Sequence, residues 1–79
     1  MFQMTIENAI KIHDNLVAVA GPCINKHLFK SPLIDEKGNV YIAHITFVKT
    51  LVYNDDIIDL GIYGSYDIES LKGLILKTA

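Results

Sequence analysis

Residues 57–76 read IIDLGIYGSYDIESLKGLIL, and they carry the pattern of a strand, a turn, one helical turn and a second strand. Within residues 57–63, isoleucine and leucine alternate with less apolar residues, as in a strand with one buried face. A Gly-Ser pair ends this strand. Asp67 is placed to cap the helical turn and Gly73 to end it, which leaves residues 74–76 as a closing strand. This order of short elements predicts a compact β-protein.

The N-terminal part of the chain adds two strand candidates and one alternative. Residues 2–6 alternate between apolar and polar side chains, and residues 9–12 continue with β-type composition. A helix over residues 5–13 competes with this interpretation, because Thr5 can cap a helix and the Glu and Ala that follow favour one. We favour strands, because Ile-Lys-Ile alternates and an Asp-Asn turn comes next.

The middle of the chain continues the β pattern. Residues 16–20 are apolar and partly β-branched, which predicts a central strand. We expect this strand to end at Gly21-Pro22, because proline has no N–H for a sheet ladder. Residues 33–34 are expected to begin a short strand before a turn over residues 35–39.

The longest strand candidate covers residues 40–52, which are apolar on both faces. Such a strand is covered on two sides, or it is a barrel strand with one face in an interface. Residues 54–56 form a second turn signal. Because no helical periodicity extends over ten residues, we predict that residues 1–79 are a single all-β domain. It is expected to be a small β-barrel with one short helical turn near the C-terminus.

Size and charge restrict what this chain does. Its 79 residues, 51% of them hydrophobic, and its mean hydropathy of +0.31 allow one domain with a core. A domain of this size buries only about 60% of its unfolded surface, so part of its apolar surface is expected to meet a partner. The net charge is −2 and all seven basic residues are lysines. Since arginine is the usual forked donor to phosphate and guanine, a nucleic-acid partner is not favoured.

Cys23 is the single cysteine of the sequence. It cannot form an internal disulfide, and no cysteine-based zinc site is expected, so a reducing, cytoplasmic location is the simplest prediction. The N-terminus lacks the positive start and long apolar run of a signal peptide. No apolar run is long enough to span a bilayer, so no membrane partner is expected. The sequence also predicts no cofactor and no metal.

Some residues could carry chemistry, but each has a more ordinary interpretation. His13 and Asp14 flank a turn, and Cys23 follows Gly-Pro at the end of an apolar segment. A small enzyme that uses His13 and Cys23, with Asp14 or His44, remains an alternative. We favour a turn histidine and an inert cysteine, and we predict no catalytic residue. The acidic residues 55, 56 and 59 lack a calcium-loop spacing, and His27 lies in an unpatterned loop.

Tyrosines give a stronger signal for an interaction surface. Tyrosine supplies contact area and a hydrogen bond at a small cost in conformational entropy. The predicted interaction surface consists of Tyr41, Tyr53, Tyr63 and Tyr66. Because a strand with two apolar faces is unusual in so short a chain, we expect a homodimer or a dedicated protein partner.

The order of these elements resembles the second domain of translational GTPases, the β-barrel of elongation factor Tu and its relatives. Residues 2–12 look like the first strands of that barrel, and residues 14–21 are similar to the family's Gly-x-Gly-x-Val-x-x-Gly segment. Residues 40–51 fall where the family has a strand that begins Val-x-x-Ile. Residues 60–76 look like its closing segment, in which Asp-Ile-x-x-Gly follows a glycine-containing strand. The resemblance covers nearly the whole chain.

The sequence also departs from this family. Asp14 and Asn15 replace two glycines, Pro22 replaces an arginine or similar residue, and residues 30–32 lack a turn glycine. The resemblance implies a non-catalytic barrel that, in the family, packs beside a nucleotide-binding domain and contacts tRNA or ribosomal RNA. No phosphate-binding Gly-x-x-x-x-Gly-Lys-Ser/Thr loop is present, which excludes GTP hydrolysis by this chain. No RNA-contacting residue is carried over, because the arginines are missing.

These observations predict a non-enzymatic interaction module. It is expected to contact a protein partner through a strand edge or through the tyrosine-bearing face. The first alternative is a small accessory factor of translation that binds a GTPase or RNA. The second is the small enzyme that uses His13 and Cys23.

Overall fold

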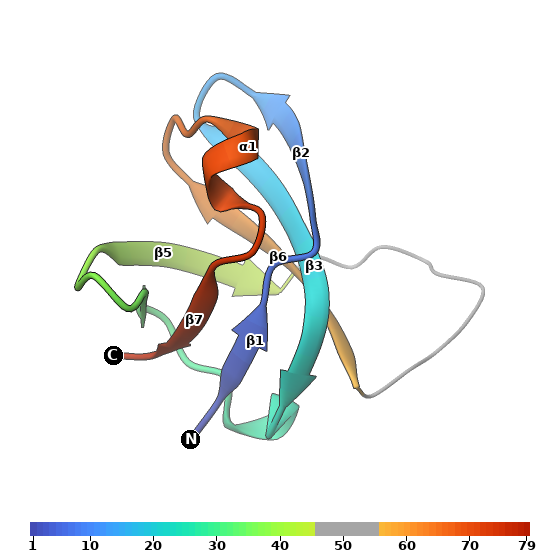
Figure 1. The fold of residues 1–79 in the computed structure, drawn as a ribbon, viewed down its shortest axis with the longest axis vertical. Coiled ribbons are helices and arrows are strands. Elements are labelled where there is room, and N and C mark those ends of the chain that lie inside the picture. The colour runs from blue at the N-terminus through green and yellow to red at the C-terminus, as the bar shows by residue number, and fades with distance from the viewer. Residues whose placement is uncertain (46–55) are drawn as a thin grey trace.

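Seven antiparallel strands make up the fold in the computed structural model, which describes residues 1–45 and 56–79 (Figure 1). The strands are β1 (Gln3–Thr5), β2 (Asn8–His13), β3 (Leu16–Ile24), β4 (Leu33–Ile34), β5 (Val40–Ile45), β6 (Ile57–Tyr63) and β7 (Ile75–Thr78). Their order is β1-β7-β4-β5-β6-β3-β2, and β1 also pairs with β3. Six strands therefore close into a barrel, and β2 extends the sheet beyond β3. The predicted all-β barrel is confirmed.

Strands β1 and β2 lie along the same edge of β3, one after the other. β2 pairs with the first part of β3, and β1 pairs with Cys23 and Ile24 at its end. The two pairings meet at Gly21, where an added Cβ would collide with the carbonyl oxygen of Thr5. A residue without a side chain is needed there, because the backbone crosses at contact distance. Both predicted strands are confirmed, and a helix over residues 5–13 is wrong.

The predicted end of the central strand at Gly21-Pro22 is also wrong, because β3 continues to Ile24. Successive N–H groups of a strand point to opposite edges. The N–H of Cys23 donates to the carbonyl oxygen of Asp56 on the β6 side, at 2.7 Å. The nitrogen of Pro22 therefore faces the other edge, where the ladder is already interrupted between β2 and β1. A proline fits at this position without the loss of a ladder hydrogen bond.

The closing unit follows the sequence prediction closely. The Asp67 side chain accepts a hydrogen bond from the backbone N–H of Glu69 at 3.2 Å and caps the short helix α1 (Ile68–Leu71). Gly73 has φ = +90°, and its N–H donates to the carbonyl oxygen of Ile6 at 2.7 Å. The Gly73 turn thus extends the pairing of β7 with β1. The helix α1 lies beside β2 (Figure 1).

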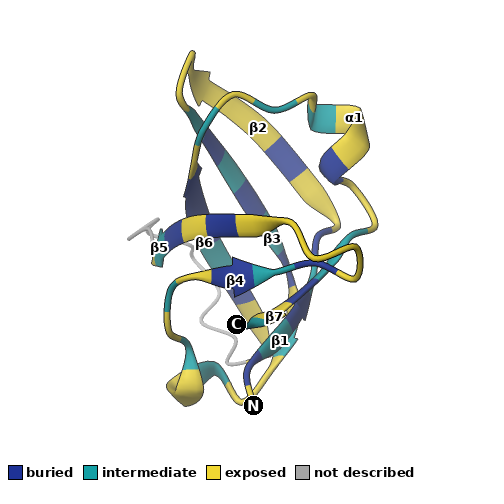
Figure 2. Ribbon diagram, turned by 90° about the vertical axis from the view of Figure 1, so that its left-hand side faces the viewer, coloured by how far each residue is buried: buried dark blue, intermediate teal, exposed yellow. Residues whose placement is uncertain are grey.

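The core fills the inside of the barrel. Its fully buried large side chains are Phe2, Met4, Ile6, Val17, Val19, Leu33, Ile58, Leu60, Ile62, Leu71 and Leu76. Exposed and buried residues alternate over the first four residues of β5, whereas β6 contains three successive buried residues (Figure 2). Of the long strand predicted over residues 40–52, residues 40–45 form β5, and the remainder lies outside the described residues.

Candidate interaction surface

The register of four neighbouring strands places a set of apolar side chains on the outside of the barrel. Ala18 of β3 lies opposite Gly61 of β6, and Leu16 lies opposite Tyr63. On the two flanking strands, Ile10 lies opposite Ala18 and Ile42 lies opposite Tyr63. We call this surface the sheet face, and its members are Ile10, Ile12, Leu16, Ala18, Ile42, His44, Gly61 and Tyr63.

Four members of the sheet face are exposed, three are half-buried and Gly61 is buried. Ile10 is 64% exposed, Ile42 and Tyr63 are each 53% exposed, and Ile12 is 52% exposed. None of its eight members is a lysine, aspartate or glutamate. Single exposed apolar residues are common on proteins, but a contiguous apolar patch is typical of an interaction site.

Two aromatic rings lie together on this surface. The ring of Tyr63 lies over the ring of His44, with 4.9 Å between centroids and 33° between planes. The Nδ1 atom of His44 is buried and has no hydrogen-bond partner among the residues that the structure describes. Tyr63 and His44 come from adjacent strands, so the β5–β6 pairing itself sets their stacking. This contact gives the face a fixed aromatic element between Ile42 and Gly61.

Of the predicted tyrosines that the structure describes, Tyr41 and Tyr66 lie against each other, and Tyr63 lies on a different side of the barrel wall. Tyr63 lies on the sheet face, whereas Tyr41 is 5% exposed and belongs to the core. Tyr66 is half-buried, with its ring centroid 5.4 Å from that of Tyr41. Tyr53 lies outside the described residues. Tyr41 therefore offers almost no exposed contact area, since it lies with Ala43 on the buried side of β5.

A buried carboxylate holds Tyr41 in place. Asp35 accepts hydrogen bonds from the Tyr41 hydroxyl at 2.8 Å, from the Asn39 side chain at 3.0 Å, and from the backbone N–H groups of Lys37 and Asn39. The Asn39 side chain is the largest of the hydrogen-bonding influences that lower the pKa of Asp35 to about 2, against the opposing effect of burial. Burial, followed by the bond to Asp35, raises the pKa of Tyr41 to about 12. The turn at residues 35–39 was predictable from sequence, but its long-range bond to Tyr41 was not.

The residues of the enzyme alternative lie apart. His13 pairs with Leu16 at one end of β3, and Cys23 pairs with Met4 near the other end. At about 3.3 Å per residue, roughly 20 Å of strand separates them. His13 and Cys23 therefore cannot act as a nucleophile and its base in this fold. Within residues 1–45 and 56–79, no three His, Cys, Asp or Glu side chains converge in an arrangement that could hold a metal ion.

A contact through a strand edge was predicted without naming the strand; among the described strands, β2 has such an edge, because it pairs with β3 alone. Its other side is approached by α1, which lies against it (Figure 1). A neighbouring helix is one of the ways in which proteins protect an edge strand from further pairing. The sheet face, which contains Tyr63 of the predicted tyrosines, is therefore more accessible than the edge of β2.

Comparison with known proteins identifies no relative of this chain. No protein-family model matches the chain, and no curated protein and no solved structure is significantly similar to it. Across the described parts of the chain, no helix is long and apolar enough to cross a membrane.

Proposed function

We propose that this protein is a non-enzymatic interaction module whose sheet face binds a protein partner. The observation that supports the proposal is the sheet face itself, whose members include no lysine, aspartate or glutamate and on which Ile10, Ile12, Ile42 and Tyr63 are more than half exposed. Burial of the exposed half of such a side chain contributes about 1 kcal/mol to binding. Tyr63 is the expected centre of the contact, because tyrosines are enriched among the residues that dominate binding energy.

The resemblance to the second domain of translational GTPases supports a narrower alternative. In that version, the protein is an accessory factor of translation, and its partner is a GTPase or an RNA. A protein partner fits the sheet face better than RNA does, because the face has no cation and the chain has no arginine.

Matched variants test the proposal. The double variant Ile10→Asp/Ile42→Asp places two carboxylates on the sheet face, and Ile24→Asp places one at an exposed site at the other end of β3. The tagged wild-type protein and both variants are used to capture partners from an extract of the source cells, after circular dichroism shows that all three are folded. A specific partner is expected with wild type and Ile24→Asp, and at least tenfold less of it with the double variant.

Capture that is equal for all three proteins would contradict the sheet face as the docking site. Light scattering over a range of concentrations identifies the case in which the partner is a second copy of the chain. If the captured protein is a GTPase or a ribosomal component, the narrower alternative gains support. A partner from another process would still support an interaction module, but it would exclude the role in translation.

A further inference from the structure

A second exposed apolar group lies at the end of the barrel that carries the 3-10 helix η1 (Lys26–Leu28). Met1 is 69% exposed, Ile24 is 58% exposed, Leu28 is 46% exposed and Ile57 is 45% exposed. We call this group the η1 end. Its members lie in one region, because Gln3 pairs with Ile24, Pro22 pairs with Ile57, and the Asn25 side chain donates to the Met1 carbonyl oxygen at 2.9 Å.

Three lysines lie in or next to the η1 end. Lys26 belongs to η1, and its Nζ donates to the carbonyl oxygen of Ile57 at 3.0 Å. Lys77 lies opposite Gln3, so it projects from the same row of the barrel as Ile24. Lys30 follows Phe29, whose ring packs on Phe2. Neither Lys30 nor Lys77 forms an ion pair with any residue that the structure describes.

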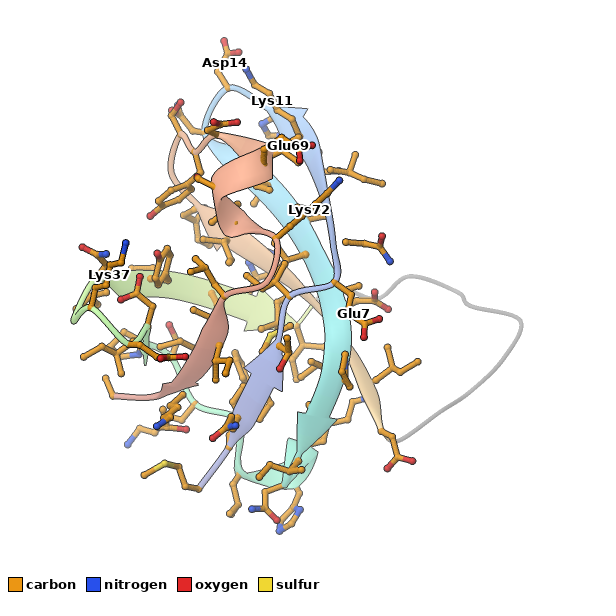
Figure 3. The ribbon with its side chains drawn as sticks, in the orientation of Figure 1. Glu7, Lys11, Asp14, Lys37, Glu69 and Lys72 are labelled. Atoms are coloured by element: carbon orange, nitrogen blue, oxygen red, sulfur yellow. The ribbon has the colours of Figure 1, made fainter. Side chains whose placement is uncertain are left out.

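The opposite end of the molecule has a different charge pattern. There, Lys11 is 3.7 Å from Asp14, and Lys72 is 3.4 Å from Glu69 (Figure 3). Asp67, which caps α1, adds further negative charge at this end. At the η1 end, Lys26 and Asp56 carry opposite charges, and Lys30 and Lys77 add positive charge beyond this balance among the described residues. The protein is therefore acidic overall and positive at one apolar end.

From this combination we infer that the η1 end docks on the surface of an anionic phospholipid bilayer. Exposed aliphatic side chains next to lysines are the pattern of proteins that bind in the membrane interface, where acyl chains and anionic headgroups are both within reach. The charge asymmetry orients the protein, because the acidic end is repelled by the same surface. The contact is weak and reversible, and it needs no membrane-spanning segment, so the absence of an apolar span from the sequence does not oppose it.

This contact is separate from the sheet face. Asn8, Ala20 and Asp59 form a row between the two surfaces, in which Ala20 lies opposite both Asn8 and Asp59. A partner on the sheet face and a bilayer at the η1 end can therefore bind at the same time. The two proposals also fail independently, since each has variants that leave the other surface unchanged.

Vesicle sedimentation tests the inference. Purified protein is mixed with vesicles of phosphatidylcholine alone, or with about 30% phosphatidylserine to give an anionic surface. Binding is expected only to the anionic vesicles and should weaken as salt is added. Each lysine near such a surface contributes about a fivefold factor in affinity, so Lys30→Gln and Lys77→Gln should each weaken binding about fivefold.

The apolar contribution is tested by Ile24→Asp and Leu28→Asp, each of which should abolish sedimentation with the vesicles. Ile10→Asp is the matched control on the sheet face and should bind vesicles like wild type. Equal binding to neutral vesicles, no binding to anionic vesicles, or equal loss in Ile10→Asp and Ile24→Asp would overturn the inference. Binding to a single-stranded oligonucleotide in place of vesicles would overturn it too, and would assign the lysines to nucleic acid.

Discussion

The two faces of β6 differ in what their residues do, although both contain apolar side chains. Ile58, Leu60 and Ile62 point into the barrel and are at most 1% exposed. On the outer face of the same strand, Ile57 is 45% exposed and Tyr63 is 53% exposed. The inner residues exchange water for close packing when the chain folds, whereas the outer residues keep their contact with water. Hydrophobicity alone thus does not separate residues that stabilise this protein from residues that are available to a partner.

Because the two faces differ in burial, substitutions on them should have different effects. Substitutions on the inner side should lower the free energy of unfolding, and substitutions on the outer side should change binding while stability stays nearly constant. The variants below go from the largest expected loss of stability to the smallest.

Gly21→Ala should have the largest effect, because its Cβ would collide with the carbonyl oxygen of Thr5 on the inner side of β3. We expect a loss of about 4 kcal/mol or more, comparable with the whole stability of a small domain. Urea unfolding followed by circular dichroism measures this loss. Gly38→Ala is the comparison, because a Cβ at Gly38 has open space around it and only the positive φ of +89° should cost stability, by about 1 kcal/mol. A Gly21→Ala protein as stable as the Gly38→Ala protein would contradict the close crossing of β1 and β3.

Leu60→Ala removes a fully buried side chain from the inner face of β6. The lost burial and the resulting cavity should cost about 3 kcal/mol. Ile57→Ala on the outer face of the same strand serves as the control and should cost much less, because its side chain is already half exposed. Thermal and urea unfolding of the two variants give the comparison directly. Equal losses would mean that the two faces of β6 do not differ as the structure shows.

Tyr41→Phe removes the inward hydroxyl that donates to Asp35. We expect a loss of about 1–2 kcal/mol, because a buried acceptor loses one partner. The pKa of Asp35 is lowered from 3.8 to about 2 in the folded protein, so its stabilising contribution is present above pH 4 and disappears as the pH falls towards 2. This acid-induced loss should be smaller in Tyr41→Phe than in wild type. Tyr63→Phe, on the outer face, should show the wild-type dependence between pH 4 and 2.

Gly73→Val tests the turn that joins α1 to β7. Its φ of +90° disfavours a β-branched residue, although the space around it is open. Backbone strain alone should therefore cost about 1 kcal/mol, less than the loss in Leu60→Ala. An unchanged melting temperature would show that the turn relaxes without strain.

Ile42→Ser should have the smallest effect on stability, within about 0.5 kcal/mol, because the side chain lies on the outer face of β5. The same change should weaken capture of the partner by the sheet face. A large loss of stability would place Ile42 among the structural residues and remove it from the proposed contact surface.

Parts of the fold could be predicted because local chemistry specified them. The alternation in residues 57–63, the Asp67 cap and the Gly73 turn all depend on residues close in sequence, and the structure confirms each of them. The continuation of β3 through Pro22 could not be predicted, since it depends on which edge of the strand the proline nitrogen faces. That edge is set by β1 and β6, which are distant in sequence.

The candidate sites show the same limit. The sequence indicated that tyrosines and a strand with two apolar faces were candidates for an interface, but it could not separate Tyr41 from Tyr63. Each of the two tyrosines lies in a β-strand and has apolar neighbours. The bond from Tyr41 to Asp35 and the position of Tyr63 over His44 depend on how β5 pairs with its neighbours.

By itself, the sequence determined an all-β domain with its main strands, turns and helical cap, because these follow from side-chain periodicity and backbone preference. Only the tertiary structure decided which apolar residues are buried. Closure of the barrel through the β1–β3 pairing gives each strand an inside and an outside. The physical reason is that burial depends on contacts between strands far apart in the chain, and the alternation along a single strand does not specify which of its two faces they cover.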